Sequence, residues 1–344
     1  MKKKWKILIT LIVVFLFALA ATCSYVYVEM CGSDFKLSEQ ETFIYIDRDD
    51  TMDSVQWKVM NQGMATHETG YKLVRRYRKF DSPLTGRYRI EKGESMMDVV
   101  TRFSQKMQTP MNLTVGNSRT MDRLSRSLSN QLMIDSVEVI ALLTDTALMR
   151  GWGYDRQTLP VMIVPDTYQV YWDITAEALI DRIRKEHERF WNGERLAKAE
   201  QIGLSKNEVC TLASIVDEET NNAGEKPMVA GLYMKRLQLG MPLQADPTVK
   251  FALQNFTARR ITNSMLKADS PYNTYIHRGL PPGPIRIASK VGIDAVLNYV
   301  KHDYVYMCAK EDFSGTHNFS RTYSEHLTNA RRYQQALNKR KIFK

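Results

Sequence analysis

The chain has 344 residues, of which 44% are hydrophobic and 25% charged, a composition typical of a folded globular protein rather than a disordered one. Its four cysteines are too few for a disulfide scaffold. No Walker A, GxSxG, HExxH or CxxC motif is present, which argues against phosphate loops, hydrolase serines and zinc sites. The net charge of +10 favours an anionic neighbour, such as nucleic acid, acidic lipid or an acidic polymer.

The first predicted element is a membrane-spanning helix. A start that carries four lysines is followed by an apolar run from Ile7 to about Val28. About 20 apolar residues span the ~30 Å hydrocarbon layer of a bilayer, and flanking lysines stay in the cytoplasm. Residues 1–28 are therefore expected to anchor the protein once in the inner (plasma) membrane, with the rest of the chain outside the cytoplasm. A cleaved signal peptide and a lipid anchor on Cys23 are alternatives that also export the chain.

Export argues against nucleic acid as the anionic partner and favours the membrane surface and the cell wall. Residues 29–40 are expected to form a polar stalk, followed by a small α+β module at 41–109. Alternation at residues 43–47 and the stretch 88–90 predict two strands, and Ser95 is placed to cap a helix. The module is rich in arginine and lysine, which fits either an ordinary solvated face or a binding surface.

A larger mixed region, 110–330, follows, with a basic helix or tail at 331–344. Residues 113–115 predict a strand, residues 161–171 are rich in β-forming types, and Thr175 is placed to start a helix. The expected fold class is therefore α+β: a transmembrane helix, a small module and a mixed α+β catalytic domain.

One acidic residue continues the apolar face of a predicted helix. Ser205 and Glu208 form a capping box that starts the helix. Leu212, Val216 and Glu219 then follow at spacings of four and three, so Glu219 lies over apolar residues. A carboxyl group in apolar surroundings resists ionisation, and a raised pKa suits a general acid for glycosidic cleavage.

Two points stay open at this helix. If it ends near Asp217, Glu219 is an ordinary exposed acid; if it continues, Asp217 and Glu218 are expected to turn toward the polar side. Most glycosidases also need a second carboxylate, for which Asp246 and Asp269 are the candidates.

Three polar, aromatic and proline-rich segments without helical periodicity follow, at 243–248, 270–275 and 279–284. Structured loops of this kind are often binding loops. Tyr272 and Tyr275 offer rings that stack on sugars, and the neighbouring amides offer hydrogen bonds to hydroxyl groups.

These segments resemble, in order and spacing, the motifs of the YceG-like family of membrane-anchored endolytic murein transglycosylases. The resemblance is specific over about 205–330, with moderate support from 164–168, and the first module looks only loosely like the LysM-like module of the family. Asp217 stands where the family usually has Glu, and Glu218 where it often has Lys. The matching segments are 211–220, 243–249, 270–275, 279–285 and 315–319.

The resemblance implies cleavage of nascent peptidoglycan glycan strands within the strand, after N-acetylmuramic acid and without water. Glu219 is expected to protonate the glycosidic oxygen and then to take the proton from the C6 hydroxyl of the same sugar, which closes a 1,6-anhydro ring. Such cutting is expected to terminate glycan elongation. No metal or organic cofactor and no nucleic acid is implied, whereas the lipid bilayer and peptidoglycan synthases are expected partners. Substrate-binding roles fall on Gln244, Asp246, Tyr272, Asn273, Thr274, Tyr275 and His317.

Two competing interpretations remain. A peptidoglycan hydrolase would cleave the same bond with water and use Asp246 as the base. A non-catalytic wall-binding scaffold would suit the basic charge, but it gives no role to a carboxylate on an apolar helix face.

Overall fold

The structure is a computed structural model that describes residues 2–258 and 261–340. Its contacts divide the chain into two compact units. The first unit runs to Leu113 and takes in two short segments, 131–133 and 169–174, while the second contains the remainder. Both units mix helices and strands, so the α+β fold class is confirmed.

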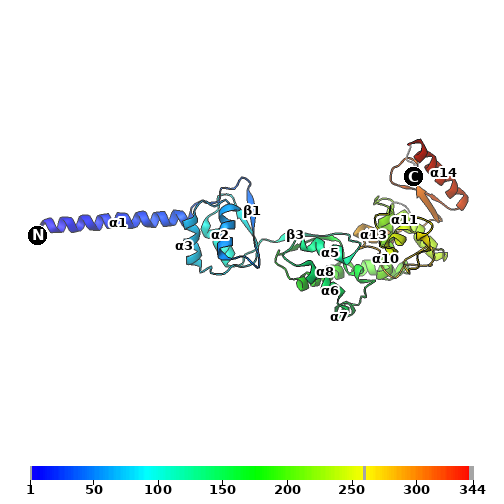
Figure 1. The fold of residues 1–344 in the computed structure, drawn as a ribbon, viewed down its shortest axis with the longest axis horizontal. Coiled ribbons are helices and arrows are strands. Elements are labelled where there is room, and N and C mark those ends of the chain that lie inside the picture. The colour runs from blue at the N-terminus through cyan, green and yellow to red at the C-terminus, as the bar shows by residue number, and fades with distance from the viewer. Residues whose placement is uncertain (1, 259–260, 341–344) are drawn as a thin grey trace. The chain divides into compact units, whose positions relative to one another are not determined.

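The N-terminal apolar run forms one continuous helix, α1 (Lys2–Cys31), at the blue end of the ribbon in Figure 1. In the described part of the chain it is the helix long and apolar enough to cross a membrane. Its last turn belongs to the first unit, because Glu29 accepts the backbone N–H of Gly70 at 3.0 Å and Met30 packs against the core.

The first unit is built on an antiparallel pair, β1 (Glu41–Ile46) and β2 (Gly86–Glu91), in which Ile44 lies opposite Tyr88. Both strands were predicted from the sequence. Ser95 caps the third helix, as predicted, by accepting the N–H of Asp98 at 3.2 Å. The three helices are α2 (Met52–Asn61), α3 (Glu68–Arg78) and α4 (Met96–Ser104).

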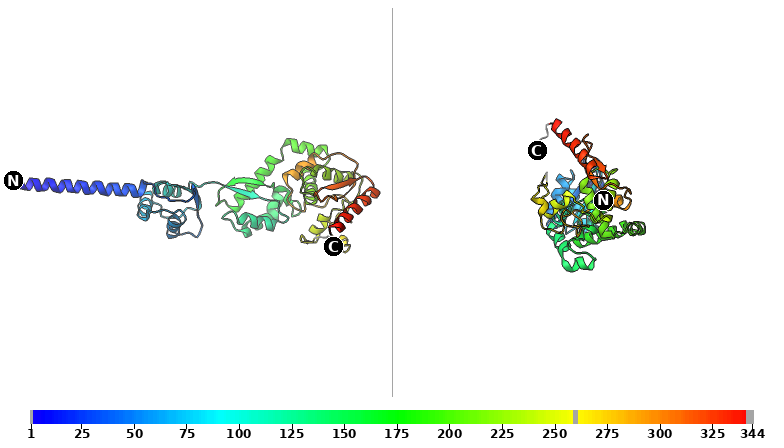
Figure 2. Two further views of the ribbon diagram at one scale, coloured as in Figure 1. Left: turned by 90° about the horizontal axis from the view of Figure 1, so that it is seen from above. Right: turned by 90° about the vertical axis from the view of Figure 1, so that its right-hand side faces the viewer.

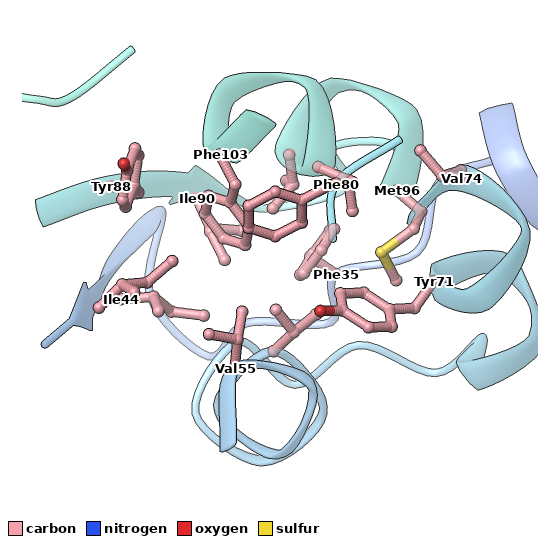
Figure 3. Packing of buried hydrophobic residues seen from close by; sticks show 14 of the residues in the cluster. Phe35, Ile44, Val55, Tyr71, Val74, Phe80, Tyr88, Ile90, Met96 and Phe103 are labelled. Carbon is pink, nitrogen blue, oxygen red and sulfur yellow. The ribbon is translucent and has the colours of Figure 1, made fainter. Parts of the chain in front are cut away.

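The core of the first unit is almost wholly apolar. Figure 3 shows Ile44 and Ile90 from the strands facing Val55 from α2 across a common interior. Phe35 and Leu37 are buried in the same cluster, with 1% and 4% of their surface exposed. The prediction of a polar stalk at residues 29–40 was therefore wrong, because this segment completes α1 and then supplies two large side chains to the core.

Two further strands, β3 (Met111–Val115) and β4 (Asp166–Val170), pair with each other, where the sequence predicted β structure. Thr175 caps α8 as predicted, through the N–H of Ala178 at 3.2 Å. The helices of this part are α5 (Met121–Ser129), α6 (Ser136–Thr144), α7 (Thr146–Gly151), the 3₁₀ turn η1 (Leu159–Met162), α8 (Ala176–Phe190) and α9 (Gly193–Gln201).

The rest of the second unit surrounds one buried helix, α10 (Lys206–Glu219), which packs against α11 (Lys226–Gln238) and α13 (Lys290–Leu297), as Figure 1 shows. Two shorter elements, α12 (Asp246–Ala252) and the 3₁₀ turn η2 (Met265–Lys267), lie within the loops that follow α11.

The chain ends in a hairpin covered by a helix. Strands β5 (Tyr306–Ala309) and β6 (His317–Ser320) are antiparallel, and α14 (Tyr323–Lys339) packs on them, as the orange and red ribbons of Figure 2 show. The basic tail expected at 331–344 is, as far as Lys339, the second half of α14. Residues 341–344 lie outside the described residues.

Candidate active site

The end of α10 places Glu219 at the border between the core and an open surface. The predicted capping box is present: the N–H of Ser205 donates to Glu208 at 2.8 Å, and the N–H of Glu208 donates to the Ser205 hydroxyl at 3.3 Å. Every residue from 209 to 217 is buried, and Glu219 is the partly buried last residue of the helix. The helix thus reaches Glu219, as its apolar spacing predicted.

The surroundings of Glu219 favour its protonated form. Burial is the largest cause, and together with the negative charge of Asp246 it raises the pKa of Glu219 to about 7. The Tyr233 hydroxyl donates to Oε1 of Glu219 at 2.8 Å, and this hydrogen bond, like the charges of His317 and Arg236, acts in the opposite direction. A carboxyl group balanced in this way can both give and accept a proton near neutral pH.

The two preceding acids do not face the solvent, so that part of the sequence prediction was wrong. Asp217 is buried, forms an ion pair with Lys226, and accepts the N–H and the hydroxyl of Ser289 at 2.6 and 2.8 Å. Glu218 binds Arg119 at 3.0 and 2.7 Å and Arg286 at 2.8 Å. Both are held by cations, whereas Glu219 forms no ion pair within the described residues.

Arg236, a buried residue of α11, organises the loop that faces Glu219. It donates to the backbone carbonyl of Leu243 at 2.6 Å and to that of Val305 at 2.7 Å. The next residue, Gln244, has φ +50°, a left-handed conformation that is strained for a side-chain-bearing residue. Its Oε1 accepts from Arg236 at 3.4 Å, and its N–H donates to Thr274 O at 3.0 Å.

Asp246 begins α12, and its Oδ1 accepts the hydroxyl of Tyr275 at 2.6 Å. Burial and this carboxylate raise the pKa of Tyr275 above its ordinary value, so the phenol remains a hydrogen-bond donor. Of the two candidate second carboxylates, Asp246 acts on Glu219 through its charge. Asp269 is exposed and is not among the charges that shift the pKa of Glu219.

Asn273 and Thr274 are fully buried and bond within the protein. The amide of Asn273 donates to two backbone carbonyls, those of Leu266 and Ala268, at 2.9 Å each. The Thr274 hydroxyl lies 2.8 Å from that of Thr248 and accepts the N–H of Ala245 at 3.0 Å. Their place in the fold is to position the 270–275 loop, which differs from the substrate contact expected from the sequence.

The remaining predicted residues lie at the edges of this group. Tyr272 packs its ring on that of Phe251, with centroids 4.7 Å apart. His317 is fixed by Glu225, which accepts its backbone N–H at 2.5 Å and lies 3.0 Å from its Nδ1. Nδ1 is thus engaged by a carboxylate, and the charge of His317 acts to lower the pKa of Glu219.

Sequence reasoning missed three residues of this site: Glu225, Tyr233 and Arg236. A signal existed for Arg236, because it follows Val229 and Leu232 at helical spacing and so lies on an apolar face, as Glu219 does. The described residues contain no group of three or more His, Cys, Asp or Glu side chains arranged to hold a metal ion.

Comparison with known proteins agrees with the motifs of this site. The model of the YceG-like family matches residues 44–332, and the chain therefore belongs to the YceG-like family. The endolytic murein transglycosylase of Bacillus subtilis (strain 168) is 25% identical over 289 residues, covering 79% of each chain.

Two other relatives extend this picture. The endolytic murein transglycosylase of Streptococcus pneumoniae serotype 2 (strain D39 / NCTC 7466) is 24% identical over 278 residues, and the match covers 72% of this chain but only 50% of the pneumococcal one. The crystal structure of a YceG-like protein from Listeria monocytogenes has the same fold, with a TM-score of 0.59 and 22% identity over 85% of this chain and 99% of its own.

Proposed function

We propose that this protein is a lytic transglycosylase that cuts the glycan strands of peptidoglycan, with Glu219 as both acid and base. Family membership and the names of the relatives support the reaction class. The observation that carries the assignment of Glu219 is its environment, a partly buried carboxyl group with a pKa raised to about 7 and no cation paired to it in the described part of the chain.

In the proposed cycle, protonated Glu219 gives its proton to the oxygen that links N-acetylmuramic acid to the next N-acetylglucosamine. The bond from that oxygen to C1 of the muramic acid breaks, and positive charge develops on the sugar ring. Ionised Glu219 then takes the proton of the C6 hydroxyl, and O6 bonds to C1 to form the 1,6-anhydro ring. Glu219 ends the cycle protonated, and no water is consumed.

The neighbouring groups have separate parts in this cycle. The Tyr233 hydroxyl steadies the ionised form of Glu219 between the two proton transfers. The carboxylate of Asp246, held by Tyr275, supplies negative charge facing the oxocarbenium-like sugar. Because the attacking hydroxyl belongs to the same sugar, its reaction has the advantage of an intramolecular step.

The presence of Asp246 beside Glu219 also supports a second candidate, a hydrolase in which Asp246 activates water. The mass of the new glycan ends separates the two reactions. The detergent-solubilised full chain is incubated with purified peptidoglycan, and the products are analysed by mass spectrometry. Anhydro ends, one water lighter than reducing ends, are expected; ordinary reducing ends would replace the proposal by hydrolysis.

Glu219→Gln keeps the size of the side chain but cannot transfer a proton, so we expect its rate to fall by a factor of about 10²–10⁴ or more. Asp269→Asn is the matched control, since this exposed acid does not act on Glu219, and it is expected to cut at the normal rate. A Glu219→Gln protein that still cuts would assign the chemistry to another residue.

The first unit and α1 are proposed to determine where the protein acts, the first unit by binding glycan and α1 by anchoring the chain in the membrane. The order of β1, two helices and β2 supports a LysM-like, glycan-binding role for the first unit. With the lysines before Ile7 in the cytoplasm, α1 would hold both units outside it, close to membrane-bound peptidoglycan synthases. A reporter fused after Lys344 is expected to be active outside the cytoplasm, and activity inside would overturn this orientation.

A further inference from the structure

A cavity of about 750 Å³ opens within the second unit, beside the loops of the candidate active site. Phe251 and Tyr272, the ring pair at the end of α12, form one of its walls. Arg119, which binds Glu218 next to the catalytic residue, and Pro284 of the 279–284 loop line it as well. Asp246 and Phe251 are five residues apart on α12, which is about 7–8 Å along a helix, so this wall of the cavity is about that far along α12 from Asp246.

The floor of this cavity is apolar and its rim is basic. Leu143, Met149 and Leu159 are buried beneath it. On the rim, Arg150 and Arg156 are exposed, and their side chains make no hydrogen bond or ion pair with any residue of 2–258 or 261–340.

The other charged residues of the lining are already engaged. Arg119 is bound to Glu218, and Asp122 pairs with Arg126 at 3.2 Å. Asp155 accepts two backbone N–H groups at the start of η1, at 2.9 and 2.8 Å. The neutral partners of Asp155 do not cancel its charge, so the two guanidinium groups of Arg150 and Arg156 against this one carboxylate leave the lining with a net excess of one positive charge.

We infer that this cavity receives the peptide that branches from a muramic acid residue of the bound strand, and that Arg150 and Arg156 bind the carboxylates of that peptide. The inference rests on the proposed function. Peptidoglycan peptides combine alanine methyl groups with free carboxylates, which match an apolar floor and paired guanidinium groups. The volume is within the usual range for pockets that enclose a small ligand.

Charge distinguishes this occupant from the sugar chain itself. The N-acetylglucosamine rings are uncharged and would use the aromatic wall. In an intact strand the lactyl carboxyl group of muramic acid is bound in the amide to the peptide, so the free carboxylates for the two arginines come from the peptide. The cavity therefore adds a preference for strands that carry peptides to a site that acts on the sugar chain.

The first test compares two substrates, glycan strands with their peptides and the same strands stripped by an amidase, which keep only the lactyl carboxylate on each muramic acid. Each charge-assisted contact is worth about tenfold or more. For the detergent-solubilised full chain we expect Arg150→Ala/Arg156→Ala to lower the ratio of kcat/KM for intact over stripped strands by about 10–100-fold. Arg331→Ala, an exposed arginine of α14, is the matched control and should leave the ratio unchanged. An equal loss on both substrates, or no loss, would overturn the inference.

The second test needs no catalysis. The free tetrapeptide L-alanyl-γ-D-glutamyl-L-lysyl-D-alanine is titrated by calorimetry into Glu219→Gln protein, with and without the two arginine substitutions. Binding that the arginine substitutions abolish supports the inference, even if the products of the wild type show that the proposed reaction is wrong. Absence of peptide binding, or binding that survives both substitutions, would refute the inference while leaving the reaction untouched.

Discussion

The two units of this protein bury very different side chains. In the first unit Asp34 is the one polar residue in the buried set of described residues, and it accepts the N–H and the hydroxyl of Thr66 at 2.6 and 2.7 Å. The second unit buries Asp217, Lys226 and Arg236 together with ten or so other polar side chains. A buried polar group is costly unless it is fully paired, so the second unit gives up stability to fix the geometry of its loops.

This difference indicates that the proposed proton transfer takes place in the second unit. An apolar core such as that of the first unit specifies a fold, but it offers nothing that can exchange a proton. In the second unit the paired groups, such as Asp217 with Lys226, fix the positions of the helices around them. Glu219, by contrast, is a partly buried acid that forms no ion pair with a cation among the described residues. The contrast predicts that the two units respond differently to four kinds of change.

The largest effect is expected from the apolar core. Phe35→Ala/Leu37→Ala removes two buried side chains from the first unit, at a cost of at least about 5 kcal/mol. Hydrogen exchange should then show the first unit opening while α10 and α11 of the second unit stay protected. Leu239→Ala, at an exposed position, is the control and should alter neither unit. Simultaneous loss of protection in both would mean that the units share one cooperative core.

The next prediction concerns the buried ion pair between Asp217 and Lys226 in the second unit. Asp217→Ala leaves the buried Lys226 ammonium without its partner, which is expected to lower the free energy of unfolding by about 3–5 kcal/mol. Asp181→Ala breaks an exposed pair with Arg184 and should change it by less than about 0.5 kcal/mol. Urea denaturation of the solubilised chain measures both. Equal, small effects would show that the polar core does not contribute to the stability of the second unit.

The sequence predicted what depends on local pattern. The capping box, the spacing that leads to Glu219 and the two strands of the first unit are all properties of short segments. The burial of Asp217 was not predictable in this way, because its partners, Lys226 and Ser289, lie at the starts of two other helices that converge only in the fold. Likewise, a polar loop sequence gives no sign that Asn273 and Thr274 are fully buried, since the partners of the Asn273 Nδ2 and of the Thr274 hydroxyl lie outside the 270–275 loop and come close only in the fold.

A third, smaller effect depends on pH. The pKa of Glu219 is about 7 in the folded protein against an ordinary value of 4.5, so its protonated form stabilises the fold. This contribution is complete below about pH 4.5 and is lost as the pH rises through about 7. Glu219→Gln cannot ionise, and we expect it to be more stable than the wild type by about 3 kcal/mol near pH 8, but not near pH 4.

Urea denaturation at the two pH values measures this difference, with Asp269→Asn as the control for loss of an exposed acid. A stability difference that does not change between pH 4 and pH 8 would mean that Glu219 titrates as an ordinary carboxylate. The raised pKa would then be absent, and the assignment of Glu219 as the acid would lose its physical basis.

The smallest effect concerns the hydrogen bond that Glu219 accepts from the Tyr233 hydroxyl at 2.8 Å. This bond favours the ionised form and lowers the pKa of Glu219, so Tyr233→Phe should raise that pKa further. The alkaline limb of the kcat/KM profile, where the acid loses its proton, is then expected to move to higher pH. Near neutral pH the gain in protonated enzyme is opposed by a weaker acid in the first step, so the rate should change by less than about tenfold. Tyr323→Phe, at an exposed position on α14, should leave the profile unmoved. A limb that stays in place in Tyr233→Phe would show that the titrating acid is not Glu219, because no other described carboxylate accepts this hydroxyl.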